Sequence, residues 1–222
     1  KRVLPRVGGE WRSSFLTEPA DGKMPITAEG RRLTAERQAL ARRPVDDPEM
    51  RFPSERCIAG PASHPPMGLV MGIENIRQIV QTKTHIVVYS EEDGRTRIVP
   101  IGSVTRSVGA PTTLGESSAR WDGDVLVIET VNMSLRPATL IVTRPQGKVI
   151  ERLSFVSPGQ ILYRYTIEDA EIYDRPWSAE YPLNRSGHHT MEFACHEGNY
   201  SLSNMLKAAR EGEKRAEEKG KP

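Results

Sequence analysis

The segment TMEFACHEGNYSL, residues 190–202, places cysteine, histidine and glutamate close together. Such side chains could bind a metal ion, activate a thiol nucleophile or form a disulfide. The alternating pattern of residues 189–195 predicts a β-strand, in which Cys195 and His196 point to opposite faces and cannot form a catalytic pair. Glu192 and His196 would share a face but lie about 13 Å apart along the strand, which disfavours binding of one ion.

The other face of this expected strand carries Met191, Phe193 and Cys195, and we expect it to pack inward. The second cysteine of the chain is Cys57, far away in the sequence, so there is no CxxC pair and no metal site is predicted. In a reducing compartment the two cysteines would be small buried hydrophobic residues, and in an oxidising one they would form a bridge. The residues alone leave both interpretations open.

The sequence predicts no particular reaction and no cofactor. It contains no GxGxxG, P-loop, HExxH, GxSxG or EF-hand pattern. The net charge of +2 comes from 31 basic and 29 acidic residues, so nucleic acid is not an expected partner. No apolar run approaches the roughly 20 residues of a membrane-spanning helix, so no membrane span is predicted.

From Ile76 onward the sequence predicts strands. Asp93-Gly94, Asp122-Gly123 and Pro158-Gly159 separate successive runs and predict antiparallel hairpins. The fold class is therefore all-β, a meander over residues 71–200 that closes into a lipocalin-like barrel or curved sheet, with a two-sheet sandwich as the alternative. The ten expected strands are residues 76–82, 85–91, 95–101, 117–121, 124–131, 139–144, 148–155, 160–168, 177–183 and 189–195.

Two arms flank this β domain. Residues 1–70 form an N-terminal arm with a helix that Thr27 caps and that ends before Pro44, followed by an extended proline-rich stretch. Residues 201–222 form a C-terminal helix, capped by Ser203 and followed by a charged tail. Because the first 50 residues contain few apolar side chains, we expect them to contribute little to the core.

The candidate ligand-binding residues lie in and near the strands. Tyr163 and Tyr165 share one face of their strand with two isoleucines, so we expect that face to be buried and the tyrosine hydroxyls to need partners. The remaining candidates are Trp121, Arg120, Glu129, Glu192 and His196. Each also has a structural interpretation, such as a cross-strand pair between Arg120 and Glu129.

Several longer phrases resemble a known family. SERC, RQIVQTKTHIVV, RWDGDVLVIETVN, YTIEDAEIYDRPW and MEFACHEGNYSLSNMLKAAR are similar to motifs of a widespread family of uncharacterised, predicted exported bacterial proteins, over about residues 21–210. This resemblance implies a periplasmic or extracellular location and favours the Cys57–Cys195 bridge. A start at Lys1 without Met is consistent with removal of a secretory leader. The family implies no reaction.

Two functions remain as hypotheses. In the preferred one, the chain is an interaction protein that docks on a protein partner or sister subunits through its N-terminal arm and C-terminal helix. In the alternative, the barrel is an enzyme or carrier for a small, largely apolar molecule. A barrel interior filled with side chains would argue against the alternative.

Overall fold

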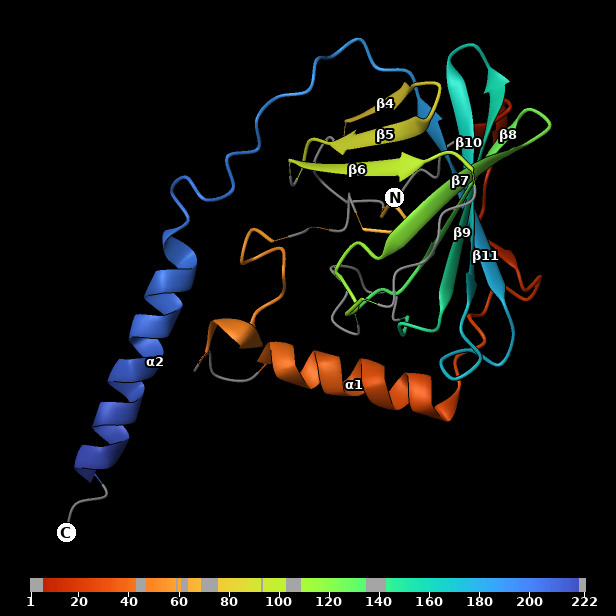
Figure 1. Ribbon diagram of the computed structural model, residues 1–222. Coiled ribbons are helices and arrows are strands. Elements are labelled where there is room, and N and C mark those ends of the chain that lie inside the picture. The colour runs from red at the N-terminus through yellow and green to blue at the C-terminus, as the bar shows by residue number, and fades with distance from the viewer. Residues whose placement is uncertain are drawn as a thin grey trace.

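The computed structural model describes residues 6–42, 47–58, 60, 64–68, 76–92, 94–102, 109–134 and 143–219. It is mostly β, with antiparallel sheets and a C-terminal helix, which confirms the coarse fold prediction. Within these residues no closed barrel is found, because the strands belong to separate sheets (Figure 1). The strands are β1 Arg6–Val7, β2 Glu10–Trp11, β3 Leu16–Glu18, β4 Arg77–Gln81, β5 His85–Ser90, β6 Arg95–Pro100, β7 Glu116–Asp122, β8 Val125–Val131, β9 Lys148–Ser157, β10 Gln160–Glu168 and β11 Trp177–Asn184.

The largest sheet has six strands in the order β3-β11-β10-β9-β8-β7, all pairs antiparallel. Strands that follow one another from β7 to β11 are neighbours in it, as the turn residues predicted. Asp122 pairs with Val125 around Gly123, and Ser157 pairs with Gln160 around the Pro158-Gly159 turn. Gly123 has φ +59, a conformation that glycine adopts without steric cost.

A second sheet contains β4, β5 and β6, again antiparallel, and a two-stranded sheet pairs β1 with β2. Asp93 of the expected β5–β6 turn and residues 139–142 of an expected strand lie outside the described residues. An isolated parallel bridge between Ile101 and Ala119 links the end of β6 to β7. Sequential antiparallel pairing therefore holds from β4 to β6 and from β7 to β11, but not for β3, which pairs with β11, nor at the junction between the two sheets.

The core lies between the three-stranded and six-stranded sheets, where their inward-facing side chains meet. In β5 and β6 the buried residues alternate with more exposed ones, as expected of strands with one covered face. A second cluster lies between the six-stranded sheet and the N-terminal segment. The first cluster contains Met67, Ile86, Val88, Val99, Ala119, Leu126, Ile128, Leu153, Tyr163 and Tyr181, and the second Met133, Val149, Ile167, Ile172, Tyr173, Trp177 and Ala179.

The N-terminal segment is part of this fold, so the expectation that the first 50 residues contribute little to the core is wrong. Phe15 packs on the first cluster, and Leu16, Ile26 and Leu33 pack on the second. Their spacing shows no long apolar run. Pairing of β3 with β11 brings the first part of the segment to the core, and the bridge between Ile26 and Tyr173 brings the start of α1 there. The division of the chain at residue 70 stays a prediction.

Helix α1, Ala28–Arg42, begins and ends as predicted. The hydroxyl of Thr27 accepts a hydrogen bond from the N–H of Gly30 (2.9 Å), which is the expected cap. The helix also lies close to the chain at Ile172, since a Cβ on Gly30 would lie 2.4 Å from that carbonyl oxygen. A short 3₁₀ helix, η1, follows at Pro48–Met50.

Residues 189–195 do not form the expected tenth strand. After β11 ends at Asn184 the chain leaves the sheet, and no strand is assigned before α2. Met191 is 71% and Phe193 41% exposed, so the inward-packing face is also wrong. The alternating pattern was present, but the segment has no neighbouring strand to supply backbone hydrogen bonds, and Cys195 is fixed elsewhere by the disulfide.

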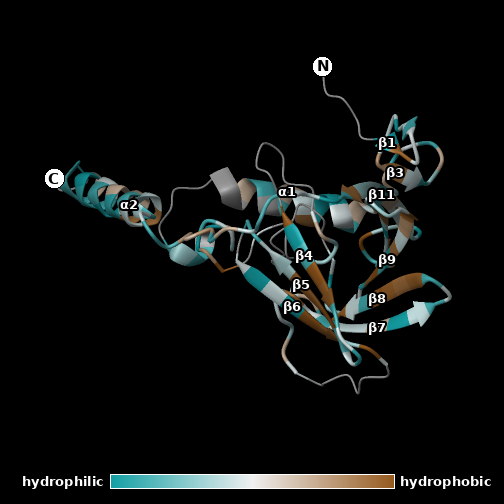
Figure 2. Ribbon diagram, turned by 90° about the horizontal axis from the view of Figure 1, so that it is seen from above, coloured by the Kyte–Doolittle hydropathy of each residue, from teal (hydrophilic) through white to brown (hydrophobic). Residues whose placement is uncertain are grey.

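Helix α2, Tyr200–Lys219, begins three residues before the predicted cap Ser203 and continues through Gly212. None of its residues is buried, and Figures 1 and 2 both show it extending away from the sheets, so the expected contact of its first turns with a barrel is wrong. Within the described part of the chain, neither helix has the length and apolar character needed to cross a membrane.

Candidate functional site

An ion pair is buried between the two sheets. Arg97 on β6 and Glu151 on β9 face each other in a two-pronged contact, with Nη2–Oε2 at 2.7 Å and Nη1–Oε1 at 3.1 Å. Their side chains are 3% and 0% exposed. Nη2 also donates to the hydroxyls of Ser117 (3.3 Å) and Thr130 (3.4 Å). The pair joins the small sheet to the large one across the core.

Two tyrosines extend this network to the loop before β4. Tyr163 donates to Oε1 of Glu151 (2.7 Å) and accepts a hydrogen bond from the N–H of Met67 (2.9 Å). Tyr181 donates to the carbonyl oxygen of Met67. The backbone of Met67 is therefore held from both sides, and its side chain is 1% exposed.

The ionisation of this network follows from burial and the opposite charges. Burial raises the pKa of Glu151, but the charge of Arg97 and hydrogen bonds from Arg97 and Tyr163 outweigh it and hold the pKa below its ordinary value. For Arg97, burial lowers the pKa, but the charge of Glu151 and the hydrogen bonds to it outweigh burial. The pKa of Arg97 is therefore raised above its ordinary value. Burial, followed by the charge of Glu151, raises the pKa of Tyr163 well above its ordinary value. Both members of the pair are charged at neutral pH.

The contacts of this network lie within the protein and join the two sheets. Both oxygens of Glu151 and both terminal nitrogens of Arg97 have partners, while Nε of Arg97 has none among the described residues. A reacting group would have to displace these contacts. Met67, Tyr163 and Tyr181 of the network also belong to the first core cluster. The network is therefore part of the hydrophobic core between the two sheets.

The predicted ligand-binding residues are not brought together. Tyr163 is buried in the network. The half-buried Tyr165 lies between it and Trp177, with its ring centroid 5.9 Å from that of Tyr163 and 5.7 Å from that of Trp177 in an edge-to-face contact. The predicted burial of the Tyr163 face is confirmed, while a ligand role for these residues stays a prediction. Burial raises the pKa of Tyr165 to about 12.

The other candidates lie nearer the surface. Trp121 is 44% exposed and Arg120 is exposed, both near the end of β7. Glu129 is half-buried on β8, with a carboxylate oxygen 3.9 Å from Nζ of Lys148. Glu192 and His196 are exposed in the segment between β11 and α2. Within the described residues, no group of three or more His, Cys, Asp or Glu side chains could hold a metal ion.

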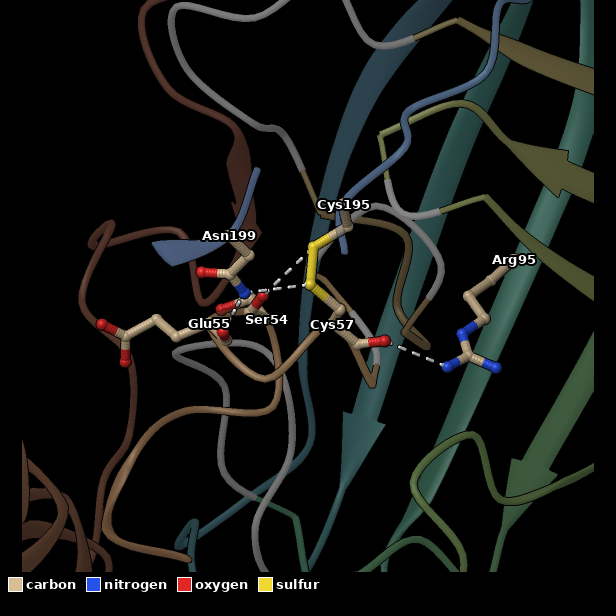
Figure 3. Close-up of a disulfide and its surroundings, with 6 residues drawn as sticks. All are labelled: Ser54, Glu55, Cys57, Arg95, Cys195 and Asn199. Atoms are coloured by element: carbon tan, nitrogen blue, oxygen red, sulfur yellow. Dashed lines mark hydrogen bonds between the residues drawn. A yellow bond between two sulfur atoms is a disulfide. The ribbon is translucent and has the colours of Figure 1, made fainter. Parts of the chain in front are cut away.

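The disulfide between Cys57 and Cys195 is present, with Cα atoms 5.7 Å apart, as the family resemblance implied. Figure 3 shows Asn199 beside it, donating to the carbonyl of Glu55 (3.3 Å) and to Sγ of Cys57 (3.5 Å). Arg95 donates to the carbonyl of Cys57 (3.4 Å). The segment that leads into α2 is therefore attached to the N-terminal loop, and through it to the start of β6.

A wide groove lies at the side of the molecule, between β4, the start of β10 and the end of β11. Its volume is about 1290 Å³. The β9–β10 turn and the segment after β11 complete its walls. The groove brings together basic and apolar side chains: Arg77, Arg185, His188, His189, Ile79, Phe155, Ile161 and Leu183.

The sequence interpretation missed both Arg97 and Glu151, although a signal for them exists. Arg97 has the same parity as Val99, and Glu151 has the same parity as Val149 and Leu153. A charged residue at an inward position of an apolar strand requires a buried partner. The groove had no such signal, because its walls come from three separate parts of the chain.

Comparisons of this chain with protein-family models, with curated proteins and with solved structures found no match.

Proposed function

We propose that this chain is an exported interaction protein whose β domain presents α2 to a protein partner or a sister subunit. The observation that best supports the proposal is the position of α2, which has no buried residue and stands apart from the sheets in Figures 1 and 2. Helices in water are stabilised mainly by packing of an apolar face, so a projecting helix gains stability when a partner covers it.

Such an apolar face is present on α2. Its members recur at positions i, i+3, i+4 and i+7, and each is only half-buried: Leu202, Met205, Leu206 and Ala209. The exposed residues between them are polar or small, and beyond Gly212 the helix is almost wholly charged. A stripe of this width suits a groove or a second helix on a partner.

The N-terminal arm has a different role in this proposal. Because β3 pairs with β11 and α1 packs beside Ile172, most of that arm is already used within the molecule. Its loop instead fixes the base of α2, through the bridge from Cys57 to Cys195 and the hydrogen bond from Asn199. An anchored helix loses less conformational freedom on binding than a free tail would.

Two further features of the proposal concern location and fold. Disulfides persist in oxidising compartments, so the bridge supports a periplasmic or extracellular location, in line with the family resemblance. We also propose that the two sheets are parts of a lipocalin-like barrel that is open between β4 and β11. The bridge from Ile101 to Ala119, which already joins β6 to β7, supports this interpretation.

Paired charge substitutions test the proposal. Leu202→Asp with Leu206→Asp places two carboxylates on the apolar stripe, whereas Ser201→Asp with Ala208→Asp places two on exposed positions of the same helix. We expect the first variant to lose self-association in light scattering, or co-purification of a partner from the cell of origin, and the control to keep it. Equal association of all three proteins, or none by the unaltered chain, would contradict the proposal.

A further inference from the structure

The groove beside β4 is a second surface with the properties of a binding site, independent of α2. One wall is the edge of the three-stranded sheet, since β5 is the one strand that pairs with β4 among the residues that the structure describes. The opposite wall is the second half of β11, residues 181–184, together with Ile161 of β10. Apolar side chains lie on both walls, and Phe155 at the rim is 74% exposed.

The register of β4 shows which of its backbone groups face this groove. The N–H of Thr82, directly after β4, donates to the carbonyl of His85 (2.9 Å). In an antiparallel pair, residues bonded to the partner strand alternate with residues whose backbone groups point away from it. Even-numbered residues of β4 therefore bond to β5, and the N–H and C=O groups of Ile79 and Gln81 point away from it. Ile79 lines the groove, and Gln81 follows it on the same edge, beyond the lining residues. They are arranged to receive another strand.

The edge of β11 across the groove differs from that of β4 in the backbone groups that it offers to an added strand. The N–H of Glu180 donates to the carbonyl of Phe15 at the β3 side (2.8 Å), so even-numbered residues of β11 point away from β10. The next of these is Pro182, which has no N–H to donate. The proline prevents regular pairing along this edge, so β4 is the edge on which an added strand can form a ladder.

The charge of the groove restricts its occupant. Arg77 and Arg185 line it, together with His188 and His189, and no Asp or Glu is among the described lining residues. Arg185 is exposed, and the guanidinium of Arg77 donates to the carbonyl of Gly68 (2.6 Å). An acidic occupant is therefore favoured over a neutral or basic one.

We propose that this groove binds an extended, acidic segment of a protein, which adds as a fourth strand to the free edge of β4. The backbone of the segment pairs with Ile79 and Gln81, alternate side chains contact the apolar walls, and its carboxylates lie near Arg185 and Arg77. This mode of recognition obtains affinity from main-chain hydrogen bonds and selectivity from alternate side chains.

A peptide-display experiment tests the chemistry of the occupant. Random decapeptides are selected on the full-length protein, and an enriched peptide is measured by calorimetry. We expect enrichment of Asp and Glu and depletion of Pro, and loss of binding when the acidic residues of that peptide are changed to Lys. Arg185→Glu should weaken binding about five- to tenfold, whereas Arg175→Glu, an exposed control outside the groove, should change it less than about twofold.

Backbone pairing has its own readout. On addition of the selected peptide, the amides of Ile79 and Gln81 should become protected from hydrogen exchange, and Ile79→Pro should weaken binding roughly tenfold while β4 stays paired with β5. If Ile79→Pro fails to fold, the binding of Arg185→Glu and the hydrogen exchange of the unaltered protein still test whether the peptide binds in the groove and pairs with β4. Selected peptides without acidic excess, unchanged protection of both amides, or binding of dodecanoate but no peptide would each overturn the proposal.

Discussion

The interior between the sheets and the segment after β11 contain the same kinds of residues and use them in opposite ways. Inside, Arg97 and Glu151 are almost fully buried and held by hydrogen bonds from several strands. After β11, charged and apolar residues such as Glu192 and Met191 are exposed, and a covalent bridge attaches the chain.

The difference shows where each part obtains its stability. A buried ion pair costs several kcal/mol in desolvation, which only complete pairing can offset, so the interior depends on every member of the network. The side chains of the segment after β11 stay in contact with water, so they cost little desolvation free energy. A change of one side chain there should therefore alter the free energy of unfolding little. The first region joins the two sheets, and the second leaves most of its side chains exposed.

The largest expected effect comes from leaving one buried charge without its partner. Glu151→Gln should lower the free energy of unfolding by roughly 3–5 kcal/mol, because Arg97 would remain buried and uncompensated. Urea denaturation measures the change. The control Glu168→Gln removes a partly exposed carboxylate from the adjacent strand β10 and should cost about 0–1 kcal/mol. Similar losses in both variants would show that burial of the ion pair does not set the size of the loss.

Removal of the bridge should have the next largest effect. Replacing Cys57 and Cys195 by Ser should lower the free energy of unfolding by about 2–4 kcal/mol, through added freedom of the unfolded chain. It should also raise the rate of amide hydrogen exchange near Asn199 more than the rate in the sheets. Titration of the unreduced, denatured parent protein should find no free thiol; two reactive thiols per chain would refute the bridge.

Alkaline pH should weaken the interior selectively. Burial raises the pKa of Tyr163, Tyr165 and Tyr181 in the folded state. Unfolded tyrosine loses its proton near pH 10, so the stabilisation is complete below that pH and is lost as pH rises toward the folded pKa values, by about 1.4 kcal/mol per pH unit for each tyrosine. Denaturation at pH 9 and pH 11 measures the slope. Tyr163→Phe should reduce the slope, while Tyr200→Phe, at an exposed position, should leave it unchanged.

The smallest effect on stability is expected on α2. Leu206→Asp should change the free energy of unfolding by no more than about 0.5 kcal/mol, because α2 has no buried residue. The matched substitution Leu153→Asp in the first core cluster should prevent folding or cost several kcal/mol. A loss of more than about 2 kcal/mol for Leu206→Asp would mean that α2 packs on the β domain in solution.

Much of the fold was predictable from local patterns. Runs such as those of β5 and β9 alternate with period two, and the Asp-Gly and Pro-Gly turns specify hairpins, since both signals depend on residues close together in the chain. The cap at Thr27 is equally local. The same reasoning failed for residues 189–195, where the alternation was present but no partner strand was available.

The sequence by itself determined the antiparallel hairpins, the first helix and the burial of the face that carries Tyr163, because each follows from the preferences and spacing of neighbouring residues. Only the tertiary structure decided that β3 joins the large sheet, that Arg97 meets Glu151, and that β4, within the described part of the chain, lies at a sheet edge beside a groove lined by Arg77 and Arg185. These features join residues distant in sequence, and their formation depends on which surfaces remain uncovered once the whole chain has packed.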